Sequence, residues 1–425
     1  MNKQPTVVLF VLDTVRRDRV SAYGYDRETT PAFDEFAKKG TLFEDAVSQS
    51  SWSVPSHASL FTGEYPTTHG ATTVRPVLRA TNPLPARLAT TGYETYAVCP
   101  NVYIRPATGF GTGFDEFYTG RRMSVPESVI QYTGSAVNRI TATPAIRRPL
   151  ERAFNWWQFR GPKTGTTSPP TYGLLERVES IVENASEPFF LFVNLPHSHL
   201  PRSPAPEYRD KFVDDGLPVD AVSRNGWQHT HAGQGMSSGE RAAMSQLYDA
   251  DVRTADDRLR DLLGCLNDRG VTDDALVIVT ADHGEHLGEN GLVGHQHSVF
   301  DPVVSVPLAV DFPSNAPERI TGQVETRRIY QTILDTAGVA PYPDRSLLST
   351  NPDETARGSY SSPMLDLSKL LQDKSIEYGA EFLGEPLTFR RKHGKKLLCF
   401  DGDCWEVPGS DSDSRCLSPT TRIAR

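Results

Sequence analysis

Short, uninterrupted runs of β-branched and aromatic residues recur along this 425-residue chain and determine its expected fold class. The run from Val7 to Leu12 is continuous and lacks the polar alternation of a strand with one face in water. Such runs fit strands that are buried on both faces, as in a parallel sheet. Residues 275–280, 189–193 and 95–99 have the same character. We therefore expect a large, mostly parallel sheet.

Helical patterns lie between these strands. One covers Pro31 to Lys39, and a second, Pro85 to Thr91, is closed by a glycine at the C-cap position. The clearest helix is expected from about Ser238 to Asn267, where Ser237 and Glu240 make a capping box. Its apolar residues recur at spacings of three, four and seven: Met244, Tyr248, Ala255, Leu259, Leu262 and Leu266. Strands that alternate with helices predict an α/β fold with helices on both faces of the sheet.

The pattern changes after about Ala340. Helical periodicity gives way to short strand-like pieces at 387–391 and 396–400, with turns expected at 393–394 and 401–402. We therefore expect two parts: a large domain over residues 1–340, and a small C-terminal α+β subdomain with antiparallel strands over residues 341–425.

Composition and charge argue against several classes of protein. The formal net charge of -9 is mild for this length and argues against nucleic-acid binding, for which a basic footprint is expected. No run of about 18 apolar residues is present, so no membrane span is predicted. Because no signal peptide is visible, the cytoplasm is the expected location. An Arg- and Trp-rich stretch, 147–160, is interpreted as a partly buried helix with solvated arginines.

The chain contains five cysteines: Cys99, Cys265, Cys399, Cys404 and Cys416. Their odd number and the lack of paired CxxC spacing argue against a disulfide framework or a zinc knuckle. The last three cluster near the C-terminus and could bind a metal or pair. Free thiols in a reducing compartment are the preferred interpretation.

Metal-binding side chains follow two of the predicted strands. Asp13 comes directly after the first strand, and Asp282 and His283 follow the strand at 275–280. Ligands of open α/β sheets bind outside the carboxyl ends of the strands. Two carboxylates brought together there would repel each other unless a cation lay between them. Carboxylates suit hard divalent ions, and an imidazole shifts the preference toward manganese, iron or zinc.

A serine-rich segment, Ser51 to Gly63, predicts a helix with a serine at its start. Pro55 suits the first helical turn and Gly63 the C-terminal end. Ser53 would then lie at the helix N-terminus, where unpaired amides and the helix dipole favour an anion such as sulfate or phosphate. The simpler alternative is that Ser53 or Ser56 only caps the helix.

Four separated stretches resemble the sulfatase family, within the alkaline phosphatase superfamily. They are VVLFVLDTVRRDRVSAYGY, TPAFDEFAKKGTLFEDAVSQSSWSVPSHASLFTGEYPTTHG, PFFLFVNLPHSHLP and VTADHGEHLGENGLVGHQHSVFDPVVSVPLAV. They follow the family's order and are spread across residues 7 to 310. The resemblance implies an alkaline-phosphatase-like fold and an ester hydrolase that depends on a divalent metal ion.

The resemblance also implies roles for individual residues. Asp13 matches the family's first metal-binding aspartate, and Asp282 and His283 match its second metal pair. Ser53 falls where the family places its nucleophile, in a C/S-x-P-S-R pattern.

Three histidines are implied in substrate binding. His199 matches the family's substrate-site histidine, and His295 falls where the family has a lysine or histidine near the transferred group. Either could protonate the leaving oxygen or bind the equatorial oxygens of the substrate. His57 takes the place of the arginine in the nucleophile motif and is predicted to contact the substrate.

Several positions depart from the family pattern. Ser53 replaces the usual cysteine, which the family converts to formylglycine, and His57 replaces the arginine that the converting enzymes are expected to read. Thr14 replaces the second aspartate of an Asp-Asp pair. His283 replaces the asparagine of calcium-using sulfatases and resembles the phosphonate monoester hydrolase branch. The family at large uses calcium, whereas His283 shifts the expectation toward one manganese or zinc ion.

The first interpretation is hydrolysis of sulfate esters, on a small molecule or a glycan, through a covalent intermediate on Ser53 or its formylglycine derivative. The alternative is a phosphomonoester, phosphodiester or phosphonate hydrolase that uses unmodified Ser53. A transferase of phospho-alcohol headgroups is disfavoured by the missing membrane span. A non-catalytic binding protein is disfavoured because Asp13, Asp282 and His283 are all retained beside the serine. The oligomeric state stays open.

Overall fold

A central sheet of nine strands organises the protein, among the residues that its computed structural model describes. These residues are 4–120, 173–223, 236–289, 292–295, 298–339, 342–349, 354–361, 386–392, 394–400, 403–408 and 421–423. The strand order is β11 (Arg319–Glu325), β2 (Thr41–Val47), β10 (Leu308–Asp311), β6 (Leu276–Thr280), β1 (Val7–Leu12), β5 (Phe189–Leu195), β3 (Glu94–Val98) and β4 (Glu116–Tyr118), with β9 (Ser305–Val306) paired to β2.

Most neighbouring strands of this sheet are parallel. The central strand β1 pairs in parallel with both β5 and β6, and every residue of β1 is buried. Strand β10 runs antiparallel to both of its neighbours. The uninterrupted apolar runs therefore mark strands covered on both faces, as predicted, and the large mixed sheet confirms the expected α/β class.

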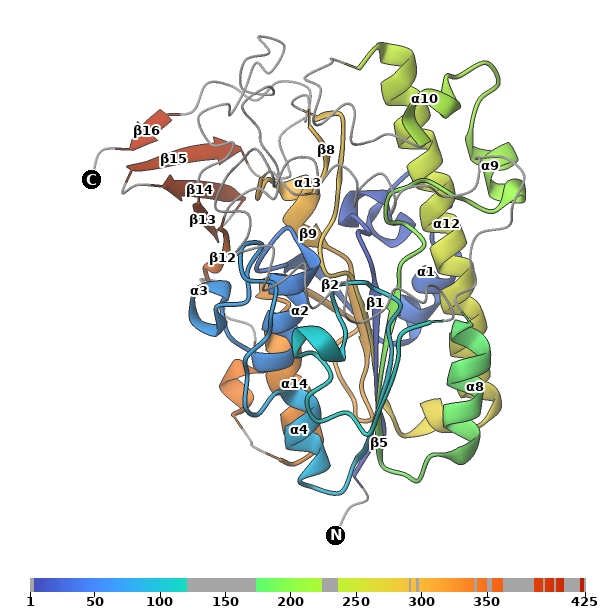
Figure 1. Cartoon of the computed structure of the whole chain (residues 1–425), viewed down its shortest axis with the longest axis vertical. Helices are drawn as coiled ribbons and strands as arrows, with labels where there is room; N and C mark the ends of the chain where they lie inside the picture. The colour runs from blue at the N-terminus through green and yellow to red at the C-terminus, as the bar shows by residue number, and fades with distance from the viewer. Residues whose placement is uncertain are drawn as a thin grey trace.

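Helices cover both faces of the sheet (Figure 1). In this view α12 (Ser238–Asp268), α8 (Leu174–Asn184) and α1 (Pro31–Lys39) lie on one side of the strands. On the other side lie α2 (Ser53–Thr62), α4 (Leu84–Ala89) and α14 (Arg328–Thr336). The remaining short helices are α3 (Pro66–His69), α9 (Pro206–Phe212), α10 (Val219–Ser223) and α13 (Asp301–Val304). No helix of the described segments is long and apolar enough to cross a bilayer.

The long helix α12 begins and ends where its sequence predicts. The Ser237 side chain accepts a hydrogen bond from the Glu240 amide, and the Glu240 carboxylate accepts one from the Ser237 amide. Its predicted apolar stripe is buried against the rest of the core. Gly270 follows the helix in the left-handed conformation, at φ 69°. The capping box and Gly270 thus mark the two ends of the helix, and the apolar period sets its buried face.

A second, smaller sheet is entirely antiparallel. It contains β12 (Ala356–Tyr360), β13 (Leu387–Lys392), β14 (Lys395–Phe400), β15 (Asp403–Pro408) and β16 (Thr421–Ile423), in that order. This confirms the small antiparallel unit expected after residue 340, and β13 and β14 match the two predicted strand pieces. The domain boundary at residue 340 stays a prediction, and the stretch 147–160 lies outside the described residues.

The small sheet contacts the segment that leads into α2. The Ser359 amide donates to the Gln49 carbonyl at 2.9 Å, and the Ser50 hydroxyl donates to the Ser359 carbonyl at 2.9 Å. Farther along, the buried ammonium of Lys396 donates to Asp301 at 2.6 Å. The small sheet is therefore joined to the large one by hydrogen bonds and a buried ion pair as well as by a shared apolar cluster.

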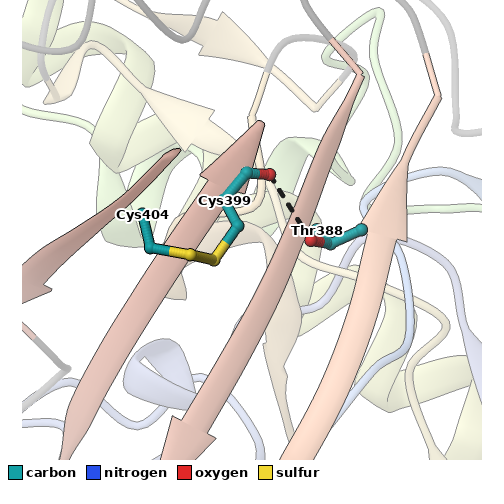
Figure 2. The surroundings of a disulfide bond; sticks show 3 residues. All are labelled: Thr388, Cys399 and Cys404. Atoms are coloured by element: carbon teal, nitrogen blue, oxygen red, sulfur yellow. Dashed lines mark hydrogen bonds between the residues drawn. A yellow bond between two sulfur atoms is a disulfide. The ribbon is translucent and has the colours of Figure 1, made fainter. Parts of the chain in front are cut away.

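The expectation of free thiols is wrong for two of the five cysteines. Cys399 and Cys404 form a disulfide between β14 and β15 (Figure 2). They are directly paired in the register of this hairpin, which brings their Cα atoms within 4.2 Å. The prediction failed because it looked for CxxC spacing and did not consider two cysteines opposite each other across a tight hairpin. Cys99 and Cys265 are free and buried, Cys416 lies outside the described residues, and the cytoplasmic location stays a prediction.

Helix α1 takes its N-terminal cap from a different helix. Its own N-cap residue, Thr30, makes no side-chain capping bond. Instead the buried Asp256 carboxylate of α12 accepts from the amides of Ala32 at 2.8 Å and Phe33 at 2.9 Å. The cap therefore also ties two helices together.

We expect Asp256→Ala to lower the free energy of unfolding by about 1–2 kcal/mol, because two amides of α1 lose their acceptor. Urea unfolding followed by circular dichroism measures this change. Asp261→Ala is the control, because Asp261 lies on the same helix and makes only partly exposed ion pairs with Arg258 and Arg260. It should change the free energy by less than about 0.5 kcal/mol. Equal losses for the two variants would contradict the capping role.

Candidate active site

The parallel pairing of β1 and β6 brings the predicted metal ligands together. Val7 pairs with Leu276 and Val11 with Thr280, so both strands end at the same edge of the sheet. Ligand atoms of Asp13, Asp282 and His283 all lie within 4.8 Å of one another, and the three side chains are buried. The structure thus brings together the three side chains that were expected to meet at the two strand ends, and their role as metal ligands stays a prediction.

Each carboxylate in this cluster has one oxygen held by the protein and one without a hydrogen bond. Asp13 Oδ2 accepts from Asn101 at 2.9 Å, and Asp282 Oδ1 accepts from the amides of Thr14 at 3.2 Å and His283 at 2.9 Å. The buried Asp13 Oδ1 and Asp282 Oδ2 have no hydrogen-bond partner among the described residues. Burial, and then repulsion by Asp282, raises the pKa of Asp13. A cation between the two orphaned oxygens would satisfy both.

His283 is oriented to complete such a site. Its Nδ1 lies 2.9 Å from the Gly284 carbonyl, so this nitrogen donates and Nε2 is left as the acceptor. Burial lowers the pKa of His283 to about 4, so the ring is neutral at pH 7. A neutral imidazole is the form that binds metals. The three side chains present therefore fit a divalent cation.

Thr14, which takes the place of the family's second aspartate, supports the cluster through its backbone. Its φ of 64° is the only positive value for a non-glycine residue in the described part of the chain. This left-handed conformation is costly for a β-branched residue. Three contacts hold it: the amide to Asp282, the hydroxyl to the Ser198 carbonyl at 2.8 Å, and the carbonyl accepting from Tyr248 at 2.7 Å. Here Thr14 orients Asp282 instead of supplying another carboxylate.

Ser53 is the first residue of α2 and faces the ligand cluster. Its hydroxyl oxygen lies 3.2 Å from His283 Nε2, and its side chain is buried. The N-cap is Trp52, which makes no side-chain capping bond, so the alternative that Ser53 or Ser56 caps the helix is wrong. Gly63 ends the helix in the left-handed conformation, as predicted. The hydroxyl therefore lies both at a helix N-terminus and beside a ligand of the cluster.

Two of the three predicted histidines lie beside the cluster. The ring centroid of His295 is 4.3 Å from that of His283 and 5.1 Å from that of His199. Burial, and then the neighbouring His283, lowers the pKa of His295 to about 4. His199 is only partly buried, and its Nδ1 lies 2.6 Å from the Leu200 carbonyl.

His57 packs against the backbone of the segment that carries Ser53. Its Nδ1 is 2.8 Å from the Ser53 carbonyl and 3.6 Å from Asp282 Oδ2, and the ring meets Phe61 and Phe192 edge-on. The side chain is fully buried. The structure therefore places His57 behind Ser53, in contact with the helix backbone and a metal-ligand candidate, and its role toward substrate stays a prediction.

Two residues of the site were missed by the sequence analysis. Asn101 follows the carboxyl end of β3, so the same strand-end rule that selected Asp13 would have found it. Glu285 lies in the same motif as Asp282, is fully buried, and has one oxygen 3.2 Å from His295 Nδ1. Burial alone would raise the pKa of Glu285, yet the adjacent Arg202 guanidinium lowers it to about 2. Nothing in its sequence position indicated that Glu285 would meet a histidine ten residues away.

Comparison with known proteins gives the family of this chain. The family model described as Sulfatase matches residues 5–339. The chain belongs to the sulfatase family. It is 23% identical over 372 residues to a sulfatase of Formosa agariphila, a match that covers 80% of this chain and 70% of the relative. The resemblance of the four sequence stretches is thus confirmed, and the protein is a sulfatase-family hydrolase.

Solved structures of other proteins share the fold. The phosphonate monoester hydrolase of Agrobacterium radiobacter has a TM-score of 0.66 at 19% identity, over 95% of this chain and 88% of that one. A protein solved in complex with its substrate D-glucosamine-2-N,6-O-disulfate has a TM-score of 0.67 at 16% identity, over 96% and 91%. A phosphonate monoester hydrolase and a protein whose substrate is a disulfated glucosamine thus share the fold of this chain.

Asn101 provides a test of the metal cluster that leaves the three candidate ligands unchanged. We expect Asn101→Ala to weaken binding of a divalent cation by about 10–100-fold, because Asp13 Oδ2 loses the donor that orients the carboxylate. Isothermal titration of the metal-depleted protein with Mn²⁺ or Zn²⁺ measures the affinity. Asn184→Ala, which removes an exposed asparagine on α8, is the control and should bind as the natural protein does. Unchanged affinity in Asn101→Ala would contradict the proposed support of Asp13.

Proposed function

We propose that this protein hydrolyses sulfate esters, with Ser53 or its formylglycine derivative as the nucleophile at a divalent-cation site formed by Asp13, Asp282 and His283. The observation that carries the proposal is the position of the Ser53 hydroxyl. It begins helix α2 and lies 3.2 Å from His283 Nε2, beside two buried carboxylate oxygens without hydrogen bonds. The substrate class is a small-molecule or glycan ester.

Each group at this site has a separate role in the proposed reaction. The unpaired amides at the start of α2 attract the anionic ester group. Ser53 Oγ forms a bond to sulfur while its proton passes to solvent, and the bond from sulfur to the alcohol oxygen breaks. His295 or His199 donates a proton to that leaving oxygen. Water then hydrolyses the covalent ester and restores Ser53. The bound ester brings negative charge beside His295, which favours the protonated form of this imidazole.

When bound, a divalent cation supplies positive charge that neutralises the ester oxygens and makes a neighbouring hydroxyl more acidic. Two carboxylates and one imidazole would hold it. This donor set favours manganese or zinc over the calcium of the family at large, because calcium prefers six to eight oxygen ligands and an imidazole suits softer ions.

Hydrolysis of phosphate or phosphonate monoesters, or of phosphodiesters, is the second candidate. The observation that favours it is the buried His57 in place of the arginine in the nucleophile motif, where the converting enzymes are expected to read an arginine. An unmodified serine would then attack phosphorus and form a covalent phosphoserine ester. Both reactions need in-line attack on a tetrahedral anion with its charge stabilised.

We expect Ser53→Ala to lower kcat by at least about a thousandfold with little change in metal content, because the variant loses only the attacking oxygen. Turnover of nitrophenyl sulfate and nitrophenyl phosphate, together with elemental analysis of the protein, measures both properties. Ser59→Ala is a matched control, because Ser59 is buried on the same helix and bonds to His69 instead of the cluster. It should keep its activity. Full activity in Ser53→Ala would exclude Ser53 as the nucleophile.

The mass of the peptide that carries Ser53 decides between the two forms of the nucleophile. Oxidation of the serine alcohol to formylglycine removes two hydrogens, a loss of about 2 Da. For the proposed sulfatase mechanism through formylglycine, we expect this loss in protein from its own host, together with faster turnover of sulfate than phosphate esters. An unmodified peptide with faster phosphate turnover would instead support the second candidate.

A further inference from the structure

We propose that Glu285 is a positioning residue that holds His295 with its hydrogen on Nδ1, so that Nε2 is the nitrogen that exchanges a proton with the leaving oxygen. The inference rests on the proposed function, in which His295 acts on the leaving group. It assigns a specific role to a carboxylate that is not among the predicted metal ligands.

The contact between Glu285 and His295 fixes the direction of one hydrogen bond. Glu285 Oε1 lies 3.2 Å from His295 Nδ1, and both side chains are almost fully buried. An ionised carboxylate only accepts hydrogen bonds, so Nδ1 must donate. The neutral ring then carries its hydrogen on Nδ1, and when the ring is protonated the second hydrogen is on Nε2.

Glu285 is itself held from its far side. Its other oxygen, Oε2, pairs with the guanidinium of Arg202, which is fully buried. Arg202 also donates to the Ser198 carbonyl at 2.7 Å and lies over the ring of Tyr248 on α12, 4.8 Å from its centroid. The carboxylate therefore cannot turn away from His295 without breaking a buried ion pair.

The orientation of His295 matters because its ring lies next to the candidate site. Its ring centroid lies 4.3 Å from that of His283, whose Nε2 contacts the Ser53 hydroxyl, and 5.1 Å from that of His199. If the ring changed tautomer, the nitrogen that faces Glu285 would lose its hydrogen, and with it the hydrogen bond that orients the ring. A carboxylate that orients a catalytic imidazole is a general device of acid–base catalysis.

A second, partly buried ion pair in the same segment serves as a control. Glu289 Oε1 accepts from Arg16 at 2.7 Å, and the Arg16 side chain is 4% exposed. Glu289 also accepts from the Leu287 amide at 2.6 Å. Loss of this pair removes a comparable ion pair near the site without removing the acceptor for His295.

The experiment compares Glu285→Gln and Glu289→Gln in the full-length, metal-loaded protein, on a series of aryl and alkyl sulfates. We expect Glu285→Gln to lower kcat about 10–100-fold for alkyl esters, whose poor leaving groups need protonation, and less than about threefold for nitrophenyl sulfate. KM should change little. Any change in kcat caused by Glu289→Gln should be the same for every leaving group. An equal loss on every ester in Glu285→Gln would overturn the proposal.

A second comparison uses His295→Ala as the background. If Glu285 acts through His295, Glu285→Gln adds less than about a twofold further loss there, because the two residues work as a unit. A full additional loss in this background would contradict the proposal.

Nitrogen-15 NMR of the histidines in the natural protein tests the geometry without relying on a variant that folds poorly. Hydrogen on His295 Nδ1 supports the proposal, and hydrogen on Nε2 alone overturns it. If the natural protein hydrolyses neither sulfate nor phosphate esters, the proposed function fails, while this measurement still reports on the contact between Glu285 and His295.

Discussion

Asp13 and Asp282 place two carboxylates side by side inside the protein, because the strands that carry them are parallel neighbours. Burial penalises both charges, and each carboxylate repels the other. The surrounding groups satisfy one oxygen of each and leave the other two without donors. A cation between the two orphaned oxygens would satisfy both. Ser53 and His295 lie next to His283, beside these carboxylates.

The site is supported from both faces of the sheet. On one face, α12 contributes Tyr248, which holds the strained Thr14, and Asp251, 3.6 Å from the buried Arg202. On the other face, α2 starts with Ser53 and carries His57 one turn later. The candidate metal site at the strand ends thus depends on two helices distant in the sequence, so the geometry of its side chains is set by the layered fold.

The α/β class and the three side chains that meet at the strand ends could be predicted from the sequence, because both depend on local patterns. Buried strands read as uninterrupted apolar runs, and the rule that ligands bind at carboxyl strand ends then selected Asp13, Asp282 and His283. The contacts of Asn101 and Glu285 could not be predicted, because they join positions that only the folded chain brings together. The disulfide was missed for the same reason, since its cysteines meet through strand register.

The contact between β12 and the segment before α2 has a consequence for the order in which the protein matures. Ser50 bonds to Ser359, which follows it by 309 positions, and the same strand also pairs with Gln49. During synthesis the nucleophile segment therefore emerges long before the strand that completes its hydrogen bonds. Any enzyme that modified Ser53 as an extended peptide would have this interval in which to act, before the finished fold buries the serine beside His283.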